Sequence, residues 1–110
     1  MPAGPTVVES IRNGDESALR SLYREYRQPF IKWMRSEYSC SEDDAADIFQ
    51  ASVVVLYDNI ISGKLQHLDK GLKEYLLGIG RLKGYEWLRM CQKENAGVKN
   101  LISHYPLNLN

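Results

Sequence analysis

The residues of this chain whose types and spacing could do chemistry begin with an acidic segment, "DDAADIFQ". It places the carboxylates of Asp43, Asp44 and Asp47 close together and follows them with the amide of Gln50. Ca²⁺ needs six or more oxygen ligands from a shaped loop, whereas this segment reads as the start of a helix. The positive end of that helix's dipole explains Asp43 and Asp44. The segment therefore predicts no metal site, and it leaves Asp47 and Gln50 as polar residues that a partner could contact.

The residue types that most often carry catalysis are scattered along the chain. His67 and His104 have no carboxylate or cysteine at ligand spacing, and neither Cys40 nor Cys91 has a nearby histidine to activate it. The "GIG" at 78–80 lacks the further glycine and the preceding strand of a phosphate-binding loop. We therefore expect no enzyme activity, no catalytic residue, no metal and no cofactor. The two cysteines are expected to be reduced thiols in a cytoplasmic protein.

Length and composition favour one domain with an uneven distribution of charge. The chain has 110 residues, 44% of them hydrophobic, and a net charge of zero. Residues 1–63 contain six basic and ten acidic residues, whereas residues 64–110 contain eight basic and four acidic residues. Such an asymmetry suggests two partners of opposite charge. The longest apolar run, "VVVLY", is too short to span a bilayer, so membrane insertion is not expected.

Apolar residues recur at spacings of three and four, which predicts helices and no strands. A short helix is expected over about 7–13, a second capped by Asp15 and kinked at Pro29, a third capped by Ser41, and a fourth over about 69–94. Helices of this kind pack as an all-α, compact bundle of about four helices. The third helix is expected to bury one face, formed by Ala45, Ile48, Phe49, Ser52, Val53, Leu56, Tyr57 and Ile60.

The expected domain covers residues 1–95. Residues 62–71, "SGKLQHLDKG", read as a polar loop before the last helix. Residues 96–110 lose the helical period and contain Pro106, so they are expected to be a linker or a loosely docked tail.

Three segments occur in an order that resembles a known family. They are "GDESALRSLYREYRQPF", "DDAADIFQASVVVLY" and "LKEYLLGIGRLKGYEWLR". Together they resemble region 2 of bacterial RNA polymerase sigma-70 factors, most closely the extracytoplasmic-function group, over about residues 7–95. The resemblance implies a helical transcription initiation domain that docks on the polymerase core and that recognises and melts the promoter minus-ten element.

In that family, the helix with the "D-L-x-Q" signature docks on a coiled coil of the polymerase beta-prime subunit. The resemblance implies that Asp47, Ile48, Gln50, Ala51 and Val54 bind the polymerase. A charged, amide-bearing helix face can fix the register of such a contact. The alternative is that Asp47 and Gln50 are only solvated surface residues.

The family's last helix and the loop before it hold the non-template strand of the minus-ten element with bases flipped out. This task requires cations along the phosphates and flat side chains for unstacked bases. Tyr75 and Trp87 are aromatic residues of the expected last helix. The alternative to base stacking for both is packing in the core. The implied DNA-binding residues are Lys64, Gln66, His67, Lys70, Lys73, Tyr75, Arg81, Lys83, Tyr85, Arg89 and Lys93.

The sequence departs from the family pattern at several positions. Ala51 replaces a glutamate, Leu82 replaces a frequent asparagine, and Glu86 replaces an aspartate. Asparagine reads base edges, so Leu82 bears on promoter preference more than on binding. Gly80 and Gly84 indicate close approach to the last helix by either a neighbouring helix or DNA.

The chain lacks region 4, the helix-turn-helix domain that reads the minus-thirty-five element. We expect a fragment of a longer factor rather than a natural single-domain variant. The leading alternative function is a helical protein-interaction module, an anti-sigma target or adaptor, that does not bind DNA. An anti-sigma factor is a further partner class under either interpretation. A small-molecule-binding bundle ranks third, because no polar groups converge in the apolar faces.

Overall fold

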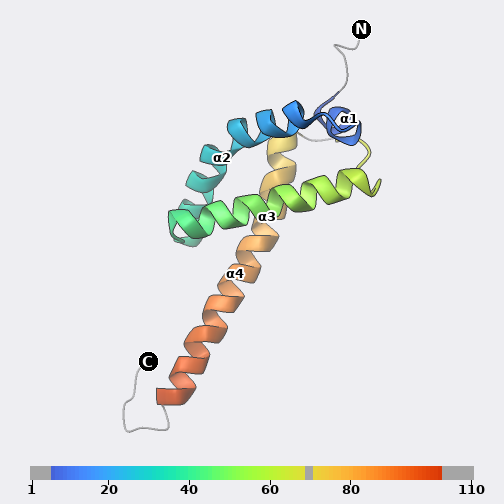
Figure 1. Cartoon of the computed structure of the whole chain (residues 1–110). Coiled ribbons are helices and arrows are strands. Elements are labelled where there is room, and N and C mark those ends of the chain that lie inside the picture. The colour runs from blue at the N-terminus through green and yellow to red at the C-terminus, as the bar shows by residue number, and fades with distance from the viewer. Residues whose placement is uncertain (1–5, 69–70, 103–110) are drawn as a thin grey trace.

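A computed structural model describes residues 6–68 and 71–102, with 92–102 as helical backbone only. It contains the helices α1 (Val7–Arg12), α2 (Glu16–Tyr38), α3 (Glu42–Ile61) and α4 (Leu72–Ile102) (Figure 1). No strand occurs within these ranges, so the predicted all-α bundle of four helices is confirmed. Within the same ranges, no helix is long and apolar enough to cross a membrane.

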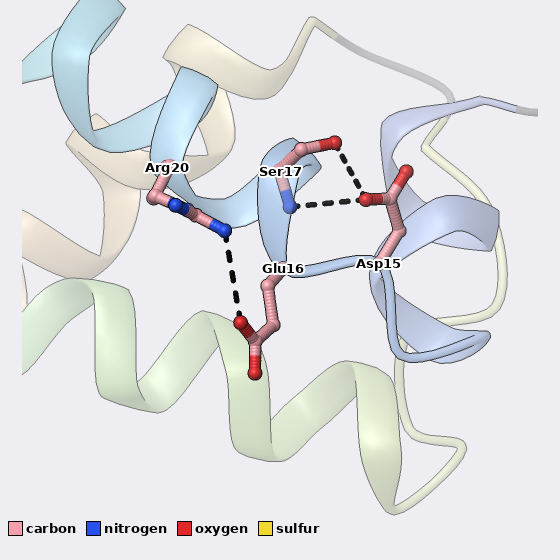
Figure 2. Close-up of polar contacts among 4 residues, drawn as sticks. All are labelled: Asp15, Glu16, Ser17 and Arg20. Carbon is pink, nitrogen blue, oxygen red and sulfur yellow. Dashed lines mark hydrogen bonds and ion pairs between the residues drawn. The ribbon is translucent and has the colours of Figure 1, made fainter.

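Each of the first three helices begins at a side chain that accepts a backbone hydrogen bond. Thr6 forms a capping box at the start of α1. Asp15 accepts hydrogen bonds from the backbone N–H of Ser17 at 3.0 Å and from its hydroxyl at 2.6 Å (Figure 2). The hydroxyl bond is the main cause that lowers the pKa of Asp15. Ser41 caps α3, so the caps predicted at Asp15 and Ser41 are both confirmed.

The second helix is continuous but bent. Pro29 lies inside α2, where its ring offers no N–H and crowds the carbonyl one turn earlier. Figure 1 shows α2 changing direction along its length, in agreement with the kink expected from Pro29. The bent helix contacts α1, α3 and α4.

The core is built around α3, which packs against each of the other three helices. Phe49, Leu56 and Ile60 of α3 are fully buried, together with Met34 of α2 and Leu76 of α4. In Figure 1, α3 crosses α4 near the beginning of α4. One face of α3 is therefore buried by the contacts that hold the bundle together.

Tyr57 does not belong to that buried face, contrary to the prediction. Its side chain is 41% exposed, whereas Leu56 before it is fully buried. Successive residues of a helix are turned by about 100°, so Tyr57 lies at the edge of the surface that α2 and α4 cover. The helical period therefore predicted the buried face correctly except that it included Tyr57, although Ile60 farther along the helix is buried.

Two glycines let α4 approach α2 closely. A Cβ on Gly80 would lie 2.6 Å from the ring of Phe30, and a Cβ on Gly84 would lie 2.7 Å from the ring of Tyr38. The neighbour that these glycines accommodate in the structure is a helix, which decides between the two alternatives left open by the sequence. Close packing offsets the cost of about 1 kcal/mol that each glycine carries relative to alanine in a helix.

The fourth helix is longer than predicted. It continues to Ile102 instead of ending near residue 94, and its first described helical residue is Leu72. Residues 96–102, which were expected in the linker or tail, extend the helix. A single glycine does not end a helix, and no proline lies between Leu72 and Pro106. Figure 1 shows this part of α4 running away from the other helices.

Replacing Gly80 with alanine is expected to lower the free energy of unfolding by about 1–3 kcal/mol, because the methyl group would meet a ring that cannot withdraw. The Phe30 ring is buried and packs against the rings of Phe49 and Trp33. Urea unfolding followed by circular dichroism measures the change. The matched control is Gly78→Ala, whose added Cβ meets no atom within 4 Å, and which should stabilise by up to about 1 kcal/mol. Equal effects of the two substitutions would contradict the close approach.

Candidate functional site

The outward face of α3 carries polar residues at its beginning and apolar residues along the rest. Asp47 and Gln50 are both exposed. Val54 is 52% exposed, Tyr57 41% and Ile61 51%. Spacings of three and four residues place all of them on one side of α3. We call Asp47, Gln50, Val54, Tyr57 and Ile61 the α3 strip.

The structure corrects one residue assigned to polymerase binding. Ile48 is 7% exposed and lies in the core with Phe49 and Val53, because it points to the side of α3 that the other helices cover. Its side chain stabilises the bundle and is not available to a partner. Ala51 is half-buried beside the strip and presents only a small surface.

The sequence reasoning missed Tyr57 and Ile61 as members of this surface. The signal was present, since the spacing from Gln50 through Val54 continues directly to both residues. Tyr57 was instead assigned to the core, and Ile61 lay at the expected end of the helix.

A groove runs beside the α3 strip. Gln50, Val54 and Tyr57 form one wall, while residues around the junction of α1 and α2 form the other, among them the acidic residues Asp15 and Glu16. The groove has a volume of about 490 Å³. Figure 2 shows Glu16 in its exposed ion pair with Arg20, at 3.7 Å. The groove is therefore lined by apolar residues from α1, α2 and α3 and by two acids, Asp15 and Glu16.

The acids at the beginning of α3 behave as the helix start predicts. Glu42, Asp43 and Asp44 occupy the first turn, and the backbone N–H of Asp44 donates to Ser41. Among the residues that the structure describes, no group of three or more His, Cys, Asp or Glu side chains is arranged to hold a metal ion.

Three of the expected DNA-binding residues share an exposed face of α4. Arg81, Tyr85 and Arg89 follow one another at four-residue intervals, and all three are exposed. The Tyr85 ring is 66% exposed, and Leu82 beside it is 69% exposed. We call Arg81, Tyr85 and Arg89 the α4 cationic face. Lys73 is also exposed, about two turns before Arg81.

Lys83 lies apart from this face. Its side chain is half-buried, and its Nζ lies 3.6 Å from a carboxylate oxygen of Glu86. The basic residues of α4 therefore do not all share one side. Lys83 is a weaker candidate for a phosphate contact than Arg81 or Arg89.

The loop between α3 and α4 presents Lys64, Gln66 and His67, each exposed. Lys70 lies outside the described residues, as does the side chain of Lys93.

Tyr75 and Trp87 are half-buried and pack against the core, which was the alternative to base stacking for both. The hydroxyl of Tyr75 accepts a hydrogen bond from Nδ2 of Asn59 at 3.0 Å and so joins α4 to α3. Tyr75 keeps one surface in a groove of about 740 Å³ between α3, the loop and α4. Glu74 and Glu86 also line that groove, so it is less suited to phosphates than the α4 cationic face.

An aromatic residue of α2 joins the α4 cationic face. The guanidinium carbon of Arg81 lies 6.0 Å from the centroid of the Trp33 ring. The hydroxyl of Tyr38, also in α2, donates to the backbone carbonyl of Arg81 at 3.3 Å. Trp33 was not identified as a candidate from the sequence. No local pattern connects it to Arg81.

Both cysteines, Cys40 and Cys91, are free. Burial raises the pKa of the Cys40 thiol, which favours its protonated and unreactive form at neutral pH.

The orientation of α3 predicts that the same substitution at two adjacent valines changes the free energy of unfolding by different amounts. Val53→Thr should lower the free energy of unfolding by about 1–3 kcal/mol, because it buries a hydroxyl in the core. Val54→Thr should change it by no more than about 0.5 kcal/mol, because Val54 is exposed. Urea unfolding of both variants measures the difference. A larger loss for Val54→Thr would contradict the α3 strip as an outward surface.

No family model, curated protein or solved structure matches this chain. The function is therefore inferred from the geometry of the α3 strip and the α4 cationic face, together with the three sequence motifs.

Proposed function

We propose that this chain is a transcription initiation domain resembling sigma-70 region 2. It docks on the beta-prime coiled coil of RNA polymerase through α3 and holds the non-template strand of the promoter minus-ten element through α4 and the preceding loop. The observation that carries the proposal is the outward position of Asp47 and Gln50, the signature residues of the third helix, beside buried Phe49 and Val53. A domain of this kind works in the cytoplasm, where a regulatory anti-sigma factor is a further expected partner.

The α3 strip has the chemistry of a protein-docking surface. Val54, Tyr57 and Ile61 offer apolar area that is lost from water on binding, and Asp47 and Gln50 supply a charge and an amide at one end. An acid beside an amide fixes the orientation of a basic helical partner. Asp15 and Glu16 on the groove's other wall also favour a positively charged partner.

The α4 cationic face has the chemistry of a single-strand surface. Arg81 and Arg89 can neutralise phosphates, and the exposed ring of Tyr85 between them can stack on an unpaired base. Stacking of one base contributes roughly 1–3 kcal/mol. The exposed residues Gln66 and His67 precede α4, and in the proposed function they contact the same strand.

Asp47→Ala and Gln50→Ala are each expected to weaken binding to an isolated beta-prime coiled-coil fragment by about tenfold, because each removes a polar contact of the docking surface. Both variants should unfold at the wild-type urea concentration, since the side chains are exposed. Isothermal titration calorimetry measures the affinity. Glu25→Ala is the matched control, because it removes one exposed negative charge from α2. Wild-type affinity in both test variants would overturn the docking surface.

Binding of a labelled, mixed-sequence single-stranded DNA to the domain on polymerase core should weaken with salt. A plot of log affinity against log salt has a negative slope, and its magnitude is expected to decrease by about 0.7 for each phosphate contact removed. Arg89→Ala should therefore flatten the slope by about that amount. Arg20→Ala, which removes an exposed charge of α2, should leave it unchanged. Fluorescence anisotropy at several salt concentrations measures the slopes, and identical slopes in wild type and Arg89→Ala would contradict the α4 cationic face.

A helical protein-interaction module without DNA binding is the second candidate function. Its specific support is the exposed apolar pair Leu82 and Tyr85 on α4, which could equally cover a protein partner. Forked promoter DNA with polymerase core separates the two functions. A shift that depends on the domain supports the initiation role, whereas docking on core without a DNA shift supports the second candidate.

A further inference from the structure

Residues 62–68, which follow α3, have a defined path although they lack regular secondary structure. Gly63 adopts a positive φ of 83° and its N–H donates to the carbonyl of Ile60 at 3.2 Å. The N–H of Leu65 donates to the carbonyl of Asn59 at 2.8 Å, and the Leu65 side chain is buried. The chain thus turns back on the end of α3 before it reaches Gln66 and His67.

A side chain that is distant in sequence but close in space completes this arrangement. Nη2 of Arg12, in the last turn of α1, donates to the carbonyl of Leu65 at 3.2 Å and to that of Gln66 at 2.7 Å. Hydrogen bonds from a charged donor are stronger than those between neutral groups. One nitrogen that binds two consecutive carbonyls restrains the peptide between them. It therefore also restrains the directions in which the side chains of Gln66 and the following residue point.

The same loop is connected to α4 through Asn59. The carbonyl of Asn59 accepts from Leu65, while its side-chain Nδ2 donates to the hydroxyl of Tyr75. Arg12 therefore closes a network that fixes the loop relative to α1, α3 and α4. The free chain already holds an arrangement that would otherwise be ordered only when a ligand binds.

We propose that Arg12 is a positioning residue for single-stranded DNA binding: it holds the backbone at Leu65 and Gln66 so that the loop is ready to receive an unstacked base, without itself contacting DNA. This inference rests on the proposed function. Removing Arg12 releases the loop, so that binding must order it again and the affinity falls.

The first test measures the clamp without any ligand. In hydrogen–deuterium exchange of the whole chain, Arg12→Ala is expected to speed exchange of the Leu65 amide by about tenfold, because the loop opens more often. Arg20→Ala is the matched control, since it removes an exposed arginine whose partner is the neighbouring Glu16. Urea unfolding and binding to the beta-prime coiled-coil fragment show that the Arg12 variant is folded. Unchanged exchange at Leu65 would overturn the clamp.

The second test separates positioning from direct contact. With the labelled mixed-sequence oligonucleotide and polymerase core, Arg12→Ala should weaken binding about tenfold with the wild-type salt slope, because no phosphate contact is lost. A slope reduced by about 0.7, as expected for Arg89→Ala, would make Arg12 a phosphate ligand and overturn the positioning role. Wild-type affinity in a variant with faster exchange would also overturn it. Failure of the wild-type domain to bind any DNA would instead reject the proposed function, while the exchange experiment would still decide whether Arg12 orders the loop.

Discussion

One face of α3, which buries Phe49, Leu56 and Ile60, packs against the other helices, and this contact decides which side of α3 remains outside. A helix buried along one face must leave another face to solvent or to a partner. In α3 the free face holds Asp47 and Gln50 followed by large apolar side chains. The close approach of α4 to α2, made possible by Gly80 and Gly84, turns Arg81, Tyr85 and Arg89 outward in the same way. Core packing thus creates both surfaces.

The two surfaces differ in chemistry and lie on different helices. The α3 strip combines apolar area with acidic and amide groups, whereas the α4 cationic face combines guanidinium groups with an exposed ring. We propose that the first surface holds a basic protein partner and that the second holds an unpaired nucleic acid strand. The loop between α3 and α4 joins the two helices, and Arg12 ties it to α1, which also contacts α3. The first helix, short as it is, therefore bears on the order of the loop.

Local sequence signals predicted the elements well because they act over a few residues. Asp15 and Ser41 cap helices where the sequence placed them, and α2 bends as Pro29 requires. Signals that depend on contact with other helices were less reliable. Tyr57 matched the apolar period but fell outside the area that α2 and α4 cover. The end of α4 beyond the predicted residue 94 has a local cause instead, because a single glycine does not end a helix. Ile48, a motif residue assigned to an interface, is core.

The sequence by itself determined that the chain forms four helices, where three of them begin, and that acids gather in the third while cations gather in the fourth. The apolar period of the sequence also indicated the buried face of α3, but tertiary structure alone decided that Tyr57 lies outside it. It also decided that Trp33 lies beneath Arg81 and that Arg12 binds the carbonyls of Leu65 and Gln66. The physical reason is range: caps and periodicity depend on neighbours within one or two turns, whereas these contacts join residues that only the packing of whole helices brings together.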